Sequence, residues 1–401
     1  MESPRNLRIV IPEVRKSHPP LHRKHRADVL SRLYTQRSIS RSELSKVTGL
    51  SAATISRITK DLVDGEVLRE VRPSRQRVGR PSPGLEINGS YRSVLGISLL
   101  APKLRLLLVD LRGELLREWE RDVDWRRGKE GILDPLRQVV IQILGEAQGG
   151  LPPLAGVGVA LPGQWDRARG TSISYPRVPE WKEVPIRSLL EEWTGHPVSL
   201  IGYAPALAVA ERTRRRGDIR NLLCVEVEDT VAMGIIANGE VLDGVSGNAG
   251  ELGHITVDPE GPLCYCGNSG CLESFSTCST VVAEYTQKNP RSDSAAMTYA
   301  RVVDLAKAQD PFAVRLCGRV AATLGIALAT ALNLFNPELL VLNGRFFHAE
   351  ELVMEPLRAS IQTRALPNTL HRVAIERSTL AERSPALGAG MVAVREVLAR
   401  I

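Results

Sequence analysis

The stretch "GHITVDPEGPLCYCGNSGCLES", Gly253–Ser274, decides how the rest of this 401-residue chain is interpreted. Three of the six cysteines fall within eight positions of it, at Cys264, Cys266 and Cys271, and His254 stands ten residues before the first. One imidazole and three thiols with the spacing H-x9-C-x-C-x4-C form a donor set that zinc binds tetrahedrally. Since all four ligands come from the protein, the pattern predicts a structural Zn²⁺ site in a zinc loop over residues 254–271.

Free buried thiols are the alternative explanation, because cysteine is among the residues most often found in protein cores. The close spacing, with glycines between the cysteines, favours a loop that wraps an ion. Cys224, Cys278 and Cys317 stand alone in apolar surroundings and are predicted to be core residues. Because no secretory segment is recognisable, we expect a cytoplasmic protein, in which clustered cysteines bind metal more often than they form disulfides.

Strand-like and helix-like segments alternate on both sides of the loop, over residues 91–401. "SVLGISL", "RLLLVDL" and "AGVGVALPG" read as short apolar strands, and "ILDPLRQVVIQILGEAQ" has helical spacing. "NLLCVEVE", "VAMGIIANGEVL" and "ELLVLNG" form a second set. The order predicts an α/β domain with two related lobes and a ligand crevice at the carboxyl ends of its strands. The longest uncharged run, Val320–Pro337, is rich in small residues and predicts a buried helix rather than a membrane span.

The positive charge of the chain is concentrated at its N-terminal end. Residues 1–90 hold 18 Lys and Arg and 9 Asp and Glu, a net of 18 − 9 = +9. The remainder holds 52 − 18 = 34 basic and 45 − 9 = 36 acidic residues, a net of −2. Residues 1–20 are predicted to be a flexible basic tail, because they are rich in proline and arginine without an apolar period. The local excess indicates an anionic partner such as nucleic acid.

Residues 21–88 have the pattern of a winged helix-turn-helix. Ser40 and Glu43 predict a capping box, Gly49 a tight turn, and Ser51 the cap of the next helix. The predicted inward-facing residues are Val29, Leu30 and Leu33, then Leu44 and Val47, then Ile55, Ile58 and Leu62. After Gly65, two extended segments flank an arginine-rich loop that suits a wing.

The second helix of such a pair enters the major groove of DNA with its N-terminal end. We therefore predict contacts with a double-stranded operator from the start of that helix and from the wing. The residues are Ser51, Ala52, Thr54, Ser56 and Arg57 in the helix, and Arg77 and Arg80 in the wing. The alternative is an amphipathic helical segment whose charges are simply solvated.

At these motifs the chain resembles the ROK family of bacterial sugar kinases and sugar-responsive repressors. "GNAGELGHITVD", "CYCGNSGCLE" and "GVGVALPGQWD" carry the resemblance, which covers almost the whole chain. It implies a two-lobed actin-like ATPase (ribonuclease-H-like) domain, and a winged helix-turn-helix in front of that domain implies the repressor branch. It also implies that Glu251, His254 and Glu273 contact sugar hydroxyls, although either glutamate could instead support the metal ligands.

The departures from the family pattern concern the kinase machinery. The phosphate loop is replaced by "GISLLAPKL", with Ser98, Leu100 and Pro102 where the family has Asp, Gly and Thr. Leucine blocks close approach to phosphate, and proline lacks an amide donor. The family's Asn-Asp pair, which holds the catalytic base, falls on Gly202 and Tyr203. A phenol with a pKa near 10 is a poor base at neutral pH, so no kinase activity is predicted.

The sugar pocket is altered as well, because Arg177 replaces a family asparagine and Tyr203 the aspartate. One hypothesis is a different effector, such as an acidic or phosphorylated sugar that pairs with Arg177. Another is a pocket without a ligand, with regulation through a protein partner. A third is that Arg177 pairs with Glu251 or Glu273.

The sequence therefore predicts a DNA-binding transcriptional regulator, a repressor of carbohydrate-related genes with structural zinc and a sugar or sugar-derivative effector. We expect a homodimer or dimer of dimers in the cytoplasm, associated with the nucleoid when bound to DNA. The alternatives are a ROK sugar kinase with an appended DNA-binding domain, and a ligand-independent regulator controlled by a protein partner.

Overall fold

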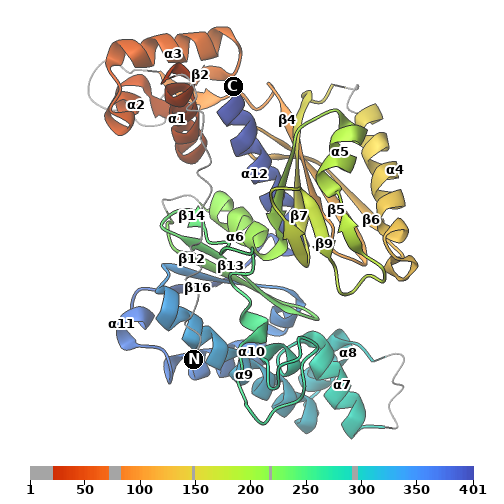
Figure 1. The fold of residues 1–401 in the computed structure, drawn as a ribbon. Coiled ribbons are helices and arrows are strands. Elements are labelled where there is room, and N and C mark those ends of the chain that lie inside the picture. The colour runs from red at the N-terminus through yellow and green to blue at the C-terminus, as the bar shows by residue number, and fades with distance from the viewer. Residues whose placement is uncertain (1–20, 72–82, 147–149, 216–218, 291–296) are drawn as a thin grey trace, which may run out of the picture. The chain divides into compact units, whose positions relative to one another are not determined.

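The computed structural model describes residues 21–71, 83–146, 150–215, 219–290 and 297–401. These residues fall into two compact units (Figure 1). The first runs through Ile87 and includes Leu398–Ile401, and the second is Asn88–Val397. Each unit has a core of its own and is described separately.

The N-terminal unit is a winged helix. Its elements are α1 (Leu21–Gln36), β1 (Ile39–Ser40), α2 (Arg41–Thr48), α3 (Ala52–Asp64), β2 (Leu68–Val71) and β3 (Gly84–Ile87). Ser40 and Glu43 form the predicted capping box, and Gly49 ends α2 at φ 70°, which a glycine adopts without strain. The strands β2 and β3 pair antiparallel, and β1 adds to β3 from the other side. The predicted wing strands are confirmed, whereas β1 was not foreseen.

The helices of this unit pack through the predicted apolar stripe with one exception. The fully buried apolar side chains of α1, α2 and α3 include Val29, Leu30, Leu33, Leu44, Ile55 and Leu62, and Ile58 is 1% exposed. Val47 was predicted to face inward, but 39% of it is exposed. It lies in the last turn of α2, next to the Gly49 turn, where no further helical turn covers it. That prediction is wrong.

The first lobe of the second unit is built on a five-stranded sheet with the order β11-β7-β4-β5-β6. Strands β4, β7 and β11 run parallel, whereas β5 and β6 are antiparallel to their neighbours. The elements are β4 (Ser93–Ser98), β5 (Lys103–Asp110), β6 (Leu115–Asp122), η1 (Trp125–Arg127), α4 (Glu130–Glu146), β7 (Leu154–Leu161), α5 (Ile186–Thr194) and β11 (Val198–Gly202). The next helix, α6 (Tyr203–Arg214), packs mainly on the sheet of the second lobe. A small antiparallel sheet joins β8 (Gln164–Asp166), β9 (Thr171–Ser174) and β10 (Lys182–Val184).

The second lobe repeats this topology with the order β14-β13-β12-β15-β16. Here β12, β15 and β16 run parallel, and β13 and β14 are antiparallel. The strands are β12 (Leu222–Val227), β13 (Val231–Ala237), β14 (Glu240–Val241), β15 (Leu339–Asn343) and β16 (Ala374–Arg377). The helices are η2 (Leu252–His254), η3 (Leu272–Ser274), α7 (Cys278–Lys288), α8 (Tyr299–Lys307), α9 (Pro311–Phe335), η4 (Arg345–Ala349), α10 (Glu350–Gln362) and α11 (Pro367–Leu370). The chain ends with η5 (Ala381–Arg383) and α12 (Ser384–Arg400). The matching strand orders confirm the prediction of two related lobes.

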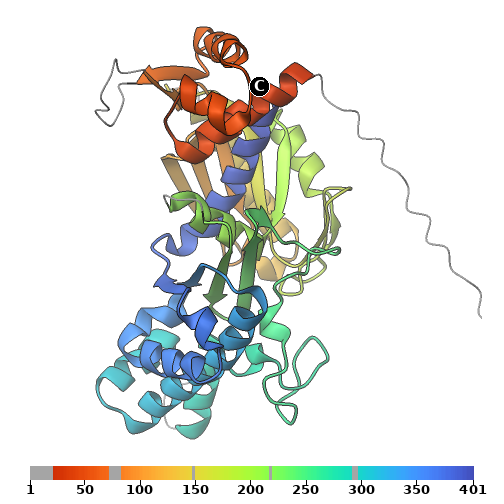
Figure 2. The same cartoon turned by 90° about the vertical axis from the view of Figure 1, so that its left-hand side faces the viewer.

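The helix α9 occupies the core of the second lobe, where it packs along α10 below the sheet (Figure 2). By length and composition it could cross a membrane. Most of its apolar residues between Ala313 and Leu332 are instead buried in the core that it shares with α10, α8 and α7, which agrees with the predicted buried helix. Cys317 on this helix and Cys224 on β12 are fully buried, and Cys278 is 1% exposed, so all three are core residues as predicted.

The C-terminal helix α12 returns to the first lobe and lies against its sheet. A Cβ atom added at Gly96 would lie 2.1 Å from the Ala386 carbonyl oxygen, and one at Gly158 would lie 1.9 Å from that of Ala389. Only glycine permits this approach of helix to strand. The last helix thereby closes the fold over β4 and β7.

Candidate metal centre and effector site

The zinc loop folds on itself through short backbone contacts. Thr256 pairs with Cys271, and Leu263 pairs with Ser269. The Cys264 amide donates to the Asn268 carbonyl at 2.7 Å, which closes a knuckle around the cysteines. These contacts bring residues from both ends of the predicted loop together.

The four predicted ligand atoms converge within this loop. The ligand atoms of His254, Cys264, Cys266 and Cys271 all lie within 4.8 Å of one another. His254 Nδ1 is 3.7 Å from Cys264 Sγ, and Cys266 Sγ is 3.6 Å from Cys271 Sγ. A tetrahedral centre with metal–sulfur bonds of about 2.3 Å places its sulfurs about 3.8 Å apart. The donor set therefore fits a metal ion in both chemistry and spacing.

Three of the predicted effector residues, Glu251, His254 and Glu273, lie near the hydroxyl of Tyr265. His254 Nε2, which points away from the thiols, lies 4.0 Å from Glu251 Oε2 and 3.2 Å from the Tyr265 hydroxyl. Glu273 is 9% exposed and accepts a hydrogen bond of 2.8 Å from the Val231 amide. Burial of the hydroxyl, the charge of Glu273 and a hydrogen bond to it raise the pKa of Tyr265. Glu251, His254 and Glu273 thus surround one phenol.

The other two predicted effector residues make different contacts. The Tyr203 hydroxyl donates to Glu226 Oε2 at 2.7 Å, and Asn343 Nδ2 donates to Glu226 Oε1 at 2.9 Å. Burial raises the pKa of Glu226 to about 7 and raises that of Tyr203 well above its usual value. The side chain of Tyr203 is therefore engaged with the end of β12.

Arg177 pairs with Asp229, whose Oδ2 lies 3.8 Å from its guanidinium. The hypothesis that Arg177 pairs with Glu251 or Glu273 is therefore wrong. The carboxylate partner of Arg177 is Asp229, in the turn between β12 and β13. Glu273 accepts a hydrogen bond from the Val231 amide, which follows the same turn. Arg177 and Glu273 therefore both contact residues 229–231.

Two backbone donors of the segment that replaces the phosphate loop are occupied within the protein. The Ala101 amide donates to the Tyr175 hydroxyl at 3.1 Å, and the Lys103 amide to the Leu100 carbonyl at 3.2 Å. Pro102, between them, has no amide hydrogen. The turn therefore presents little hydrogen-bonding capacity to a phosphate.

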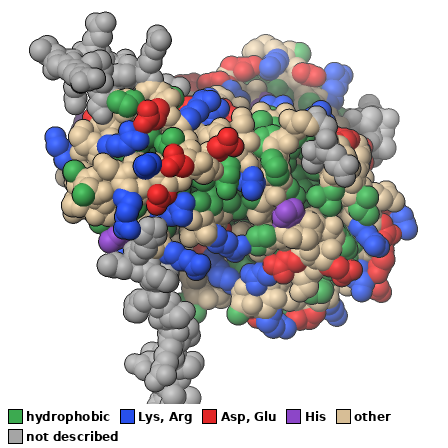
Figure 3. Space-filling view, turned by 90° about the horizontal axis from the view of Figure 1, so that it is seen from above, with side chains coloured by type: hydrophobic (Ala, Val, Ile, Leu, Met, Phe, Trp, Pro, Cys, Tyr) green, Lys and Arg blue, Asp and Glu red, His purple; other side chains and the backbone are tan. Residues whose placement is uncertain are grey.

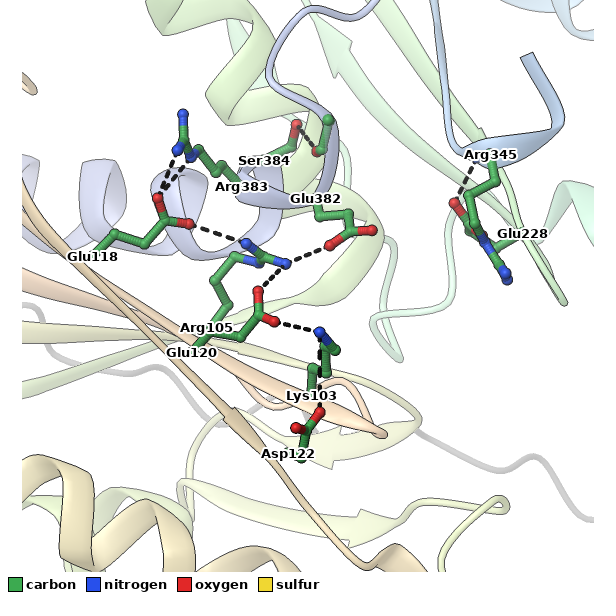
Figure 4. A network of polar contacts seen from close by, with 11 residues as sticks. Lys103, Arg105, Glu118, Glu120, Asp122, Glu228, Arg345, Glu382, Arg383 and Ser384 are labelled. Carbon is green, nitrogen blue, oxygen red and sulfur yellow. Dashed lines mark hydrogen bonds and ion pairs between the residues drawn. The ribbon is translucent and has the colours of Figure 1, made fainter. Parts of the chain in front are cut away.

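A charged cleft of about 260 Å³ lies at the carboxyl ends of β12, β15 and β16. Its charged lining comprises Arg105, Arg345, Arg377, Arg383, Glu226, Glu228 and Glu382. Figure 4 shows Arg105 of β5 reaching Glu118 and Glu120 of β6 and Glu382 of η5, with Arg383 on Glu118. Arg345 pairs with Glu228 in the same view. These arginines already have carboxylate partners.

The predicted DNA contacts of α3 lie on its solvent-facing side. Ser51, Ala52, Ser56 and Arg57 are exposed, and Thr54 is half-buried. The Ser51 hydroxyl accepts the Thr54 amide at 3.2 Å, so it also caps the helix. Arg77 and Arg80 lie outside the described residues. Lys and Arg side chains are scattered among acidic ones on the face shown in Figure 3.

Several side chains at these sites were not singled out from the sequence. Lys60 is exposed one turn beyond Ser56 and Arg57, a spacing that could have identified it. Glu226, Asp229 and Tyr265 carried no local signal, because their partners lie far away in the sequence or depend on a side-chain rotamer.

Comparisons with known proteins agree with this architecture. A model of the ROK family matches residues 94–396. The xylose repressor of Caldicellulosiruptor bescii is 26% identical over 392 residues, covering 95% of this chain and 98% of that protein. The glucokinase of Thermotoga maritima is 29% identical over 315 residues, covering 73% of this chain and 98% of that enzyme.

Among solved structures, a ROK family transcriptional regulator described as a homolog of the E. coli Mlc protein has a TM-score of 0.81 and 26% identity. The match covers 94% of this chain and 97% of that one. It extends over the winged helix as well as both lobes, whereas the glucokinase match covers less of the chain. With the family model spanning the domain from β4 into α12, the chain belongs to the ROK family.

Proposed function

We propose that this protein is a sequence-specific DNA-binding transcriptional repressor of carbohydrate-related genes. The observation that carries the proposal is the winged helix in front of a complete ROK domain, in an order shared along nearly the whole chain with a ROK transcriptional regulator and a xylose repressor. The winged helix would bind the operator, and the ROK domain would respond to a sugar. The protein would work in the cytoplasm, on the nucleoid when bound to DNA.

The operator contacts are assigned to one face of α3 and to the wing. Ser56 and Arg57 are exposed there and are placed against base edges and phosphates, with Ser51, Ala52 and Thr54 at the helix start. Arg77 and Arg80 of the wing would add further contacts, with Arg80 in the minor groove. A homodimer or dimer of dimers would read two half-sites about one helical turn, or a multiple of it, apart.

The metal centre is assigned to Zn²⁺ held by His254, Cys264, Cys266 and Cys271. Three thiols and an imidazole are ligands that zinc prefers, and four protein ligands leave no position for a substrate. When bound, the ion would fix the His254 ring through Nδ1 and leave Nε2 for a ligand. Glu251 and Glu273 would then accept hydroxyl hydrogens beside it, and Arg177 and Tyr203 would form the opposite wall.

The alternative of an active sugar kinase is disfavoured by the catalytic positions. The Tyr203 phenol has a raised pKa, keeps its proton and donates a hydrogen bond to Glu226, so it would not remove a proton from a sugar. Glu226 and Glu228 line the cleft where a triphosphate would sit, and carboxylates there repel phosphate. A regulator without a ligand, controlled by a protein partner, remains the second candidate, because Arg177 is engaged by Asp229.

The test is selection of duplex DNA from a randomised pool by the full chain, followed by release of the selected DNA with neutral sugars, sugar acids and sugar phosphates. The proposal expects one recurrent sequence and release by one sugar class. Recovery of random sequences would contradict it. A coupled assay in which ATP is consumed with any of the same sugars would instead support the kinase.

A further inference from the structure

Tyr265 occupies an unusual place in the zinc loop, since it stands between the ligand residues Cys264 and Cys266. The residue is 70% exposed, yet its hydroxyl turns inward and lies 3.2 Å from His254 Nε2. The two rings meet edge to face, with centroids 5.3 Å apart. An exposed tyrosine is therefore held to the loop chiefly through its hydroxyl end.

The groups that hold this hydroxyl are those assigned to the effector. His254 Nε2 is the ring nitrogen that does not face the thiols. Glu273, whose carboxylate lies near the phenol, is itself fixed by a hydrogen bond of 2.8 Å from the Val231 amide. A phenolic hydroxyl and a sugar hydroxyl offer the same donor and acceptor. The phenol therefore stands where a sugar hydroxyl would make its contacts.

We propose that Tyr265 is a built-in occupant of the effector site, which a sugar displaces through one of its own hydroxyls. This inference rests on the proposed sugar-sensing function and adds the residue that competes with the sugar. The backbone on both sides is held by Cys264, Cys266 and the hydrogen bond between Cys264 and Asn268. Displacement is then a rotation of one side chain, with the loop left in place.

The charges around the phenol indicate the class of sugar. Glu251 and Glu273 lie beside it, and carboxylates accept hydroxyl hydrogens but repel an anionic substituent. The guanidinium that could offset a phosphate, that of Arg177, is paired with Asp229. The displacing ligand is therefore an uncharged aldose rather than a sugar acid or sugar phosphate.

The test is isothermal titration of the full-length protein with D-xylose and D-glucose, comparing wild type with Tyr265→Phe. Phenylalanine keeps the exposed ring but frees His254 Nε2 and Glu273. Since one hydrogen bond contributes about 0.5–1.5 kcal/mol, tighter binding of at least one sugar by roughly 2- to 10-fold is expected. Leu263→Ala is the matched control, because Leu263 is 76% exposed in the same loop. It should bind sugar as wild type does.

Equal or weaker sugar binding by Tyr265→Phe overturns the inference, as does binding of neither sugar by any of the proteins. Zinc content, measured on each preparation, shows whether the loop is intact. Retention of the selected DNA is measured in parallel without sugar. Loss of that retention in the wild type would refute the repressor function itself, so the two failures are distinguishable.

Discussion

Tyr203 and Glu226 show at the scale of single residues how this chain departs from a kinase. The Tyr203 hydroxyl and the Asn343 amide both donate to the Glu226 carboxylate, which is 6% exposed. The Glu226 carboxylate accepts hydrogen bonds from both side chains. The position of the family's catalytic base is occupied by Tyr203, which is a hydrogen-bond donor. The arrangement is suited to holding side chains in place and unsuited to removing a proton.

Glu226 should make the stability of the protein depend on pH. Its pKa rises from 4.5 to about 7 on folding, chiefly through burial, so its contribution to stability is fully present below pH 4.5 and is lost as the pH rises through 7. Glu226→Gln removes this titration. Relative to wild type, the variant should gain about 3 kcal/mol in the free energy of unfolding between pH 4.5 and pH 8. Urea unfolding at the two pH values measures the change, and a pH-independent difference would contradict the expectation.

Arg57 is the residue of α3 whose loss should weaken operator binding most directly. It is exposed, so Arg57→Ala should leave the fold intact while removing one base or phosphate contact worth about 1–3 kcal/mol. Fluorescence anisotropy with the selected DNA measures the loss. Arg32→Ala is the control, since Arg32 lies on α1 and pairs with Asp28 at 3.5 Å. An equal effect of both variants would remove Arg57 from the operator contacts.

At the scale of elements, the zinc loop and the α9–α10 pair of the second lobe are held together in different ways. The loop has short 3-10 segments at its ends and isolated bridges within it, so its shape depends on the ligand cluster. The helix pair depends instead on close packing. A Cβ atom added at Gly325 of α9 would lie 2.5 Å from Ser360 Cβ on α10.

Removal of a metal ligand should disorder the loop. Cys271→Ser is expected to lower bound zinc from about one ion per chain to a small fraction after dialysis against a chelator, because a structural site needs all its ligands. The thermal midpoint should fall as well. Cys317→Ser, at a buried cysteine outside the cluster, should keep its zinc. Elemental analysis of both variants decides the matter, and full zinc retention by Cys271→Ser would rule out these ligands.

The packing of α9 on α10 can be tested with two glycines of the same helix. Gly325→Ala should lower the free energy of unfolding by about 1–3 kcal/mol, since the added methyl overpacks the contact. Gly318→Ala is the matched control. Its nearest neighbour would be Pro356 Cγ at 3.7 Å, an ordinary contact, so the better helix propensity of alanine should make it neutral or stabilising. Denaturant unfolding that shows equal effects would contradict the close approach.

What the sequence could predict follows from how local each feature is. The four metal ligands and the caps at Ser40 and Ser51 lie within short stretches, and the structure brings them together as expected. The strands β8, β9 and β10 are too short for a periodic pattern and were missed. The contacts of Arg177 with Asp229 and of Tyr203 with Glu226 join residues far apart in the chain, so only the folded structure reveals them.

At the scale of the whole molecule, one chain combines a winged helix with a two-lobed ROK domain. The two lobes share one strand order, and the ROK family model covers both. A cleft lies at the strand ends, its arginines are paired with carboxylates, and the Ala101 amide at the phosphate-loop position donates to Tyr175. This division agrees with the proposal that the ROK domain responds to a sugar and the winged helix binds the operator.

The most direct test of the account is the ratio of affinities for the selected DNA and for scrambled duplexes of equal length and composition. The measurement is fluorescence anisotropy with the full chain at about 150 mM salt, where nonspecific phosphate contacts are weakened. A sequence-specific repressor should prefer the selected DNA by at least about 1,000-fold. Equal affinity for both duplexes would contradict the central claim that this protein is a DNA-binding regulator.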